Sequence, residues 1–274
     1  MADSDFITSS LRLFLSVDVV GSTALKQRIP KREKAGEGKS VPAEPWFSPI
    51  VQFYREIERR FFQEWQQYEL KIADKTKWPA GPAPEFWKGA GDELIYTKRL
   101  TDHRQALVCL QAWIRAVNAY RTEFKKLNPT LDLKSAAWIA GFPVHNAEVF
   151  FRSSAAEKEA VVEDGDPIYS NLVLLQKYRS ANSDNSIIRD FIGPSIDTGF
   201  RIATLASPRK LVVSVDLALI LAHSIPKQRR EFDKDFGYKK PQLHYDGDIP
   251  FDLPLRFHPA AVRVSAVDTP FGAG

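Results

Sequence analysis

Two aspartates, Asp18 and Asp92, have the residue type and setting expected of metal ligands. Asp18 lies near the end of the apolar stretch LFLSVDVV, where a carboxylate is costly to bury without a partner. Asp92 stands in KGAGDEL, at a turn between two expected strands. Two such carboxylates on neighbouring strands can chelate Mg²⁺ or Mn²⁺. The pair therefore predicts a divalent-metal site. The alternatives are a plain helix start after Asp18 and a hairpin turn stabilised by Asp92.

The residues that follow Asp18 suit an anion. The chain is expected to turn through Gly21 into a short helix whose first amides, around Ser22 and Thr23, point back towards the carboxylate. A helix start beside an acidic residue suits a polyphosphate that carries its own divalent cation.

A third candidate segment is SIIRDFIGPSIDTGFRIATLA, residues 186 to 206. An apolar strand with Asp190 leads through Gly193 into a helix, on which Asp197 and Arg201 share one face at a spacing of four residues. On spacing alone, an exposed ion pair is the favoured interpretation.

The elements that must position these residues can be read from hydrophobic periodicity. An amphipathic helix with an aromatic face begins at Trp46, and a second helix, capped by Thr101 or Asp102, spans 102–127. Pro, Gly and Lys predict flexible insertions at about 27–45 and 73–85 and a frayed tail at about 267–274. The other expected elements are strands at 11–20, 86–100 (two strands), 131–144 and 186–192, and a further strand in NAEVFFRSS after residue 145. A helix is expected at 171–179, a strand and a short helix within 209–223, and a final hairpin at 254–266.

The composition excludes several classes of protein, such as disulfide-rich secreted proteins. The 274 residues, with a net charge of +4, are read as one domain over 1–274 with a core at about 11–263. The single cysteine, Cys109, excludes an intrachain disulfide framework, and the five histidines show no ligand spacing. A polar, acidic N-terminus and the lack of a long apolar segment predict a cytoplasmic protein with no membrane partner; no nucleic-acid partner is expected either.

Together, the three segments resemble the catalytic domain of class III nucleotidyl cyclases, from about Leu11 to Val215. FLSVDVVGST is similar to the first metal strand and phosphate loop of that family, KGAGDEL to its second metal motif, and DFIGPSIDTGFR to its segment for the base and the transition state. The resemblance implies an α+β, ferredoxin-like fold with a central, mostly antiparallel sheet and flanking helices. It also implies a head-to-tail homodimer with shared active sites.

The resemblance also implies roles for single residues. Two Mg²⁺ or Mn²⁺ ions per active site would be bound by the family's metal positions, here Asp18, the Val19 carbonyl and Asp92. Lys88 and Asp190 would read the base, and Arg201 would stabilise the transition state. Asp197 departs from the family, because it stands where an asparagine is expected and cannot donate a hydrogen bond to the ribose unless protonated.

A narrower resemblance is to the pyrimidine cyclases of bacterial Pycsar anti-phage defence. It implies conversion of UTP to cyclic UMP and pyrophosphate, with the product sensed by a separate effector protein. Lys88 and Asp190 match uracil, cytosine and adenine equally well, so residue chemistry leaves the base open. Tyr54 and Trp87 are candidates to fill the space of a purine ring, with the core as the alternative. The rival functions are a cytidylate cyclase, an adenylate cyclase, a diguanylate cyclase suggested by GAGDEL, and an inactive nucleotide-binding module.

Overall fold

The computed structural model describes residues 9–27, 45–75, 80–152, 167–180, 186–222 and 224. The chain divides into two compact units. The sheet unit consists of residues 12–139 and of the chain from residue 199 onwards, and the ribbon unit of residues 140–198 with the residues before Arg12. The elements in chain order are β1 (Ser10–Val20), α1 (Ser22–Lys26), α2 (Phe47–Lys75), β2 (Glu85–Ala90), β3 (Glu93–Leu100), α3 (Arg104–Leu127), β4 (Asp132–Phe142), β5 (Ala147–Arg152), α4 (Pro167–Ser180), β6 (Ile187–Ile192), α5 (Pro194–Ala203) and β7 (Leu211–Val213).

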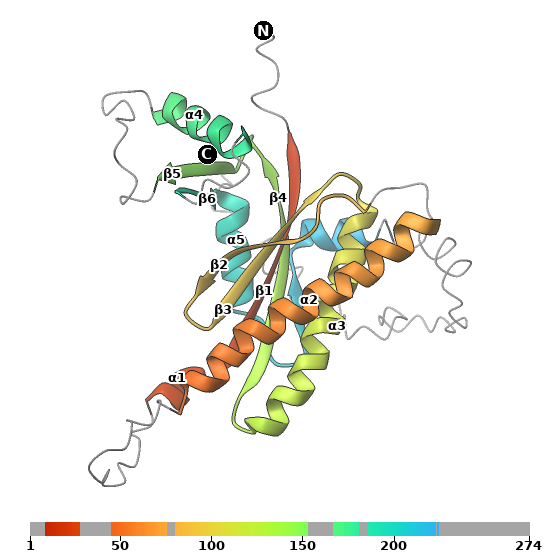
Figure 1. The fold of residues 1–274 in the computed structure, drawn as a ribbon, viewed down its shortest axis with the longest axis vertical. Helices are drawn as coiled ribbons and strands as arrows, with labels where there is room; N and C mark the ends of the chain where they lie inside the picture. Colours follow the sequence, from red (N-terminus) through yellow and green to blue (C-terminus); the bar gives the residue numbers. More distant parts are fainter. Residues whose placement is uncertain are drawn as a thin grey trace, which may run out of the picture. The chain divides into compact units, whose positions relative to one another are not determined.

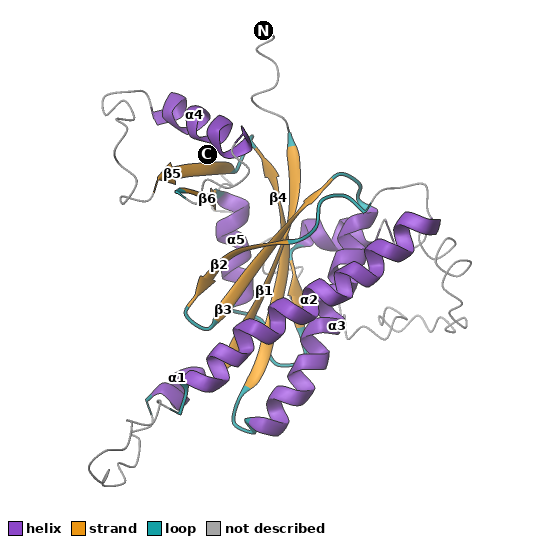
Figure 2. Ribbon diagram, in the orientation of Figure 1, coloured by secondary structure: helices purple, strands orange, loops and turns teal. Residues whose placement is uncertain are grey.

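The sheet unit is built on a five-stranded sheet in the order β2-β3-β1-β4-β7. β2 and β3 form an antiparallel hairpin, and β7 pairs parallel to β4. α2 and α3 lie together in front of this sheet, with the strands crossing behind them (Figures 1 and 2). The fold is therefore α+β with a central, mostly antiparallel sheet and flanking helices, as expected. β1, which carries Asp18, is the middle strand.

The two long helices form because their apolar residues recur at three and four positions. Ile57, Phe61 and Trp65 of the predicted aromatic face of α2 are buried, whereas Phe47 and Val51 of that face are exposed. The Phe61 ring centroid lies 4.9 Å from that of Trp113 on α3. α3 begins at Arg104, where the Asp102 carboxylate accepts the Arg104 backbone N–H at 2.9 Å. Within the described residues, no helix is long and apolar enough to span a membrane.

A glycine lets α5 approach the sheet closely. A Cβ at Gly199 would lie only 2.2 Å from the Trp138 ring of β4, so no other residue fits without displacing that ring. The next residue, Phe200, packs against the same indole with 5.8 Å between ring centroids. This contact determines which residues at the end of α5 face the sheet.

The ribbon unit pairs β5 and β6 antiparallel, and α4 packs on one face of that ribbon. The other face, here called the open face, consists of Ala147, Val149 and Phe151 and their respective partners Ile192, Asp190 and Ile188. Phe151, Ile188 and Ile192 are 45%, 42% and 52% exposed, which is unusual for large apolar side chains. Asp190 lies in the middle of the open face.

Several boundaries differ from those predicted. The segment predicted as a flexible insertion at 73–85 is partly regular, since α2 continues to Lys75 and β2 begins at Glu85. The buried Lys98 ammonium holds this connection by donating to the Ala80 carbonyl at 3.0 Å and to that of Pro82. α4 begins at Pro167 rather than at 171, because proline is well tolerated in the first turn of a helix.

Some predictions stay untested. The final hairpin, the tail, His223 and most of the insertion at 27–45 lie outside the described residues. The single domain over 1–274 also stays a prediction, and β1, β4 and α5 each contain residues of both units.

The start of β4 offers a stability test. Asp132 accepts hydrogen bonds from Arg121 at 2.7 Å and Lys125 at 2.9 Å; burial opposes ionisation, but these donors lower the pKa of its carboxyl to about 2. Because the pKa of this carboxyl is lower in the folded protein than the ordinary value of 3.8, the ionised carboxylate stabilises the fold at pH values above 3.8. This stability is lost as the pH falls towards 2. We expect Asp132→Asn to lower the free energy of unfolding by about 2 kcal/mol at pH 7 and by about 1 kcal/mol at pH 3. Urea denaturation at both pH values measures this, and equal losses at both would contradict it.

Candidate active site

The structure brings the Asp92 turn to the strand that carries Asp18. The β2–β3 turn reaches β1, where the Val19 backbone N–H donates to the Asp92 carbonyl at 3.2 Å. β1 then turns through Gly21, whose φ of +90° suits glycine and whose Cβ would lie 2.8 Å from the Thr130 carbonyl oxygen. The turn leads into α1, which has only five residues.

Asp18 lies in a cleft of about 330 Å³ that is open to solvent, together with Ser16, Glu93 and Lys134. Burial raises the pKa of the Asp18 carboxyl, and the nearby Asp92 charge adds to this effect. The Lys134 ammonium, 3.1 Å from Asp18 Oδ2, acts in the opposite direction. Burial also raises the pKa of the Glu93 carboxyl, and so does the charge of Asp18. The cleft therefore concentrates negative charge where solvent screens it poorly.

The Asp92 carboxylate is held by hydrogen-bond donors different from those at Asp18. The Ser22 hydroxyl donates to Asp92 Oδ2, and the Lys26 ammonium donates to Oδ1 at 2.9 Å. Burial works to raise the pKa of the Asp92 carboxyl, but these hydrogen bonds outweigh it and lower the pKa. The Ser22 side chain is thus committed to the carboxylate rather than directed to an anion.

These residues fit a divalent cation. The donors are carboxylate oxygens, which Mg²⁺ and Mn²⁺ prefer, and each aspartate already attracts a lysine ammonium as a counterion. Among the described residues, no group of three or more His, Cys, Asp or Glu is arranged to hold a metal. Further ligands would therefore come from backbone carbonyls, water or substrate phosphates, which is the usual way in which Mg²⁺ is held.

Tyr54 supports the turn that carries Asp92. Its hydroxyl donates to the Gly91 carbonyl at 2.6 Å, and a Cβ at Gly89 would meet that hydroxyl at 2.9 Å. The structure thus gives Tyr54 a contact with the hairpin. A contact between Tyr54 and a substrate base stays a prediction.

We expect Tyr54→Phe to weaken this support without altering substrate choice. The loss of one hydrogen bond to a partly solvated carbonyl is worth about 0.5–1 kcal/mol, so the melting temperature should fall by a few degrees. Mn²⁺ affinity, measured by electron paramagnetic resonance, should fall by a few fold because Asp92 is held less firmly. If the Tyr54 hydroxyl instead contacts the base, the ratio of kcat/KM between nucleotides will change while Mn²⁺ affinity stays the same.

Lys88 and Trp87 lie on β2. The Trp87 ring packs edge-on against the buried Phe14, with 5.3 Å between centroids, so Trp87 is at least partly a core residue. The Lys88 ammonium lies 4.1 Å from the Trp87 ring centroid and 5.7 Å from that of Phe200. These contacts are cation–π interactions, and a base-reading role for Lys88 stays a prediction.

Arg201 is not brought to the carboxylates of its own chain. Phe200, Ala203 and Thr204 of the same segment line the carboxylate cleft, whereas Arg201 does not line it and is exposed. Its side chain is therefore available to a molecule outside this chain.

The remaining predicted residues belong to the ribbon unit. Asp190 lies on the open face, and Gly193 precedes α5, where its carbonyl accepts the Asp197 backbone N–H at 3.0 Å. The Asp197 side chain is exposed.

Sequence analysis missed Lys134, Lys26 and Glu93. Lys134 is a lone cation in the apolar strand LDLKSAAWIA, so the reasoning applied to Asp18 would have singled it out. Glu93 directly follows Asp92 and had no separate signal.

No protein-family model matches this chain, and no curated protein matches it. Solved structures with a similar course of chain include the adenylyl cyclase CyaB from P. aeruginosa, with 8% identity over 79% of this chain and 82% of that one and a TM-score of 0.48. The guanylate cyclase domain of RhGC from Catenaria anguillulae in complex with GTP has 7% identity over 78% and 84%, with a TM-score of 0.47. The guanylyl cyclase Cya2 has 11% identity over 80% of each chain, with a TM-score of 0.40. The case for a function therefore rests on the side chains of this chain.

Proposed function

We propose that this protein is a nucleotidyl cyclase that converts UTP to 3′,5′-cyclic UMP and pyrophosphate. The observation that carries the proposal is the pair of carboxylates, Asp18 and Asp92, joined through the Val19 hydrogen bond at 3.2 Å at the edge of an electronegative cleft. A nucleoside triphosphate with divalent cations is the substrate class that such a site attracts.

In this reaction the ribose 3′ oxygen attacks the α-phosphorus, and the bond from that phosphorus to the α,β-bridging oxygen breaks. The hydroxyl proton passes to water, and pyrophosphate leaves with the bridging oxygen. Two Mg²⁺ or Mn²⁺ ions, when bound, would activate the 3′-hydroxyl and neutralise the triphosphate. Asp18 and Asp92, with the Val19 carbonyl, would hold those ions. The backbone amides from Gly21 to Thr23 would bind the phosphates.

The second set of residues would come from another copy of the chain. Arg201, a permanent cation with several donors, would neutralise charge developing on the α-phosphate. Because Arg201 does not line the carboxylate cleft of its own chain, we propose a head-to-tail homodimer in which it enters the partner's site. The open face of the ribbon unit, with exposed Phe151, Ile188 and Ile192, supplies apolar surface for that interface.

Lys88 and Asp190 would read the base, with a Lys donor beside an Asp acceptor, and Asp197 would lie near the ribose. Uracil is preferred on the resemblance to the Pycsar cyclases, with cytosine second and adenine third. On this proposal the enzyme acts in the cytoplasm in anti-phage defence, and a separate effector protein senses cyclic UMP.

The proposal is tested by incubating the purified protein with Mn²⁺ and each of the four ribonucleoside triphosphates separately, with products resolved by mass. Asp92→Ala serves as the control. Formation of cyclic UMP by the wild type but not by the control supports the proposal. Formation of cyclic CMP or cyclic AMP instead would support the cyclase reaction but overturn the choice of base. A dinucleotide product would indicate a diguanylate cyclase. Tight nucleotide binding without turnover would indicate a binding module.

A further inference from the structure

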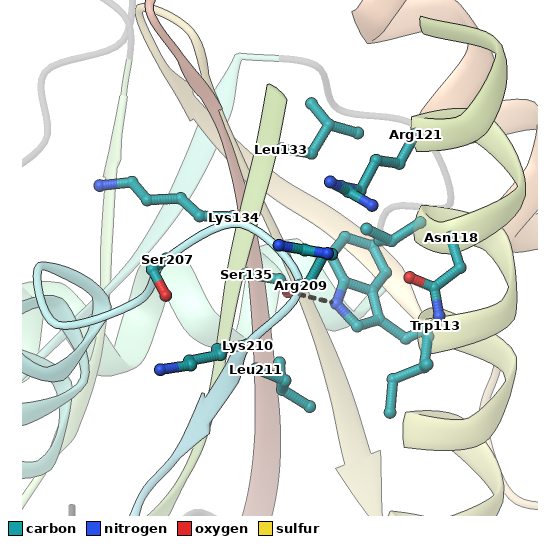
Figure 3. Close-up of a pocket in the computed structure, with 12 residues that line it drawn as sticks. Trp113, Asn118, Arg121, Leu133, Lys134, Ser135, Ser207, Arg209, Lys210 and Leu211 are labelled. Carbon is teal, nitrogen blue, oxygen red and sulfur yellow. Dashed lines mark hydrogen bonds between the residues drawn. The ribbon is translucent and has the colours of Figure 1, made fainter. Parts of the chain in front are cut away.

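A second cleft, of about 410 Å³ and open to solvent, lies between α3, β4 and the turn before β7. Its apolar lining, here called the apolar wall, includes Trp113, Leu133 and Leu211 (Figure 3). The Trp113 indole N–H donates to the Ser135 hydroxyl at 2.8 Å, which anchors this wall. An apolar wall with a few polar groups beside it is a feature of small-molecule sites.

The polar side chains around this cleft are almost all hydrogen-bond donors. Four of the residues that line it, namely Arg121, Lys134, Arg209 and Lys210, are cationic, and none is acidic. Arg121 is held by Asp132 at 2.7 Å and Lys134 by Asp18 at 3.1 Å, and neither aspartate lines the cleft. The excess of donors makes an anion the complementary ligand.

Two of these cations have no partner among the residues that the structure describes. Within the ranges that the structure describes, the side chains of Arg209 and Lys210 make no hydrogen bond or ion pair, and the same holds for the Asn118 amide and the Ser207 hydroxyl. Figure 3 shows Arg209, Arg121 and Asn118 drawn beside the Trp113 indole. Of the uncommitted donors, the Arg209 guanidinium and the Asn118 amide therefore lie beside the apolar wall.

The backbone at Arg209 gives an independent reason to assign a function. The Lys210 N–H donates to the Ser207 carbonyl at 2.9 Å, which closes a turn with Pro208 second and Arg209 third. Arg209 has a φ of +67°, and this turn position favours glycine or asparagine. An arginine there opposes the stability of the turn, and strained residues of this kind are concentrated at binding and catalytic sites.

We propose that this cleft binds the phosphate group of a small molecule, with Arg209 as its principal ligand and Arg121 beside it. A dianionic phosphate suits two or three cations better than a singly charged carboxylate does, and guanidinium groups bind it in bidentate fashion. The phosphate belongs either to the free inorganic ion or to a monoester whose body packs on the apolar wall. The proposal is independent of nucleotide turnover.

Binding can be followed through the indole N–H signals of protein labelled with ¹⁵N-tryptophan, with the Trp113 signal identified by its loss in Trp113→Phe. Titration with inorganic phosphate, without divalent metal, should move the Trp113 signal saturably. Adenosine 5′-monophosphate is the second arm: tighter binding than phosphate identifies a monoester, and equal or weaker binding identifies the free ion. Asp92→Asn should leave this binding unchanged, which separates the cleft from the carboxylate site.

Arg209→Gly is the decisive variant, because it removes the guanidinium and suits the left-handed backbone. We expect phosphate affinity to fall at least tenfold while the melting temperature stays unchanged or rises. The charge-matched control, Lys126→Gln at the exposed end of α3, should bind as the wild type does. A Trp113 signal that does not move in the wild type, or an Arg209→Gly protein that binds phosphate with unchanged affinity, would overturn the proposal.

Discussion

Replacing Asp92 with asparagine is expected to reduce nucleotide turnover about a thousandfold. A bound metal stabilises the transition state by several kcal/mol, and a loss of that size corresponds to this fall in rate. Asparagine keeps the shape of the side chain but removes the charge that Ser22 and Lys26 now surround. Mn²⁺ affinity should fall at least tenfold in the same variant, as measured by electron paramagnetic resonance. Asp18→Asn should behave likewise.

The matched control is Asp216→Asn, which removes an exposed carboxylate outside the cleft. It should retain full turnover and full Mn²⁺ affinity. If Asp92→Asn binds Mn²⁺ as the wild type does, the metal role of the carboxylate pair is wrong, whatever happens to turnover. If it loses Mn²⁺ but keeps turnover, the pair is a metal site that does not serve the reaction.

Arg201→Ala is expected to lower kcat by about 10²–10³, as the removal of other electrostatic stabilisers does. Its effect on Mn²⁺ affinity should be small, because Arg201 does not line the carboxylate cleft of its own chain. Arg201→Lys should recover only part of the rate, since an ammonium lacks the planar, bidentate donors of a guanidinium. A fall in Mn²⁺ affinity as large as that for Asp92→Asn would contradict this separation of roles.

Mixing the two inactive variants tests whether the site is shared. In a head-to-tail dimer, Arg201→Ala paired with Asp92→Asn has one intact site and one doubly altered site. After random exchange of subunits, half of the dimers are mixed, so about a quarter of the wild-type activity should return. Activity no greater than the sum of the two variants would overturn the shared site, yet it would leave the products of the wild-type enzyme as evidence for cyclase chemistry.

The proposed phosphate cleft and the carboxylate cleft meet on β4. Lys134 and Ser135 line both, and the Ser135 hydroxyl also donates to the Ser16 carbonyl on β1 at 2.6 Å. One strand therefore separates a cation-rich site from a carboxylate-rich one. On these proposals the carboxylate cleft binds phosphates only through divalent cations, whereas the cationic cleft binds phosphate without a metal.

Most elements of the fold, and the two aspartates of the site, could be predicted from the sequence because their signals are local. The aromatic face of α2 follows from residues three and four apart, and the hairpin that carries Asp92 follows from its glycines between apolar runs. Asp18 was found because a carboxylate in an apolar strand needs a partner. These signals are contained within about one helix or hairpin of sequence.

Contacts between distant segments were decided only by the tertiary structure. Asp18 pairs with Lys134 of another strand, and the Tyr54 hydroxyl holds a carbonyl 37 residues away. Arg201 is exposed and does not line the carboxylate cleft, because the fit of Gly199 against Trp138 determines which face of α5 packs. Sequence periodicity shows which face of an element is buried, but not which other element covers it. The amino-acid sequence by itself therefore determined the elements and the two aspartates, and packing decided their counterions, their support and the separate cleft at Arg209.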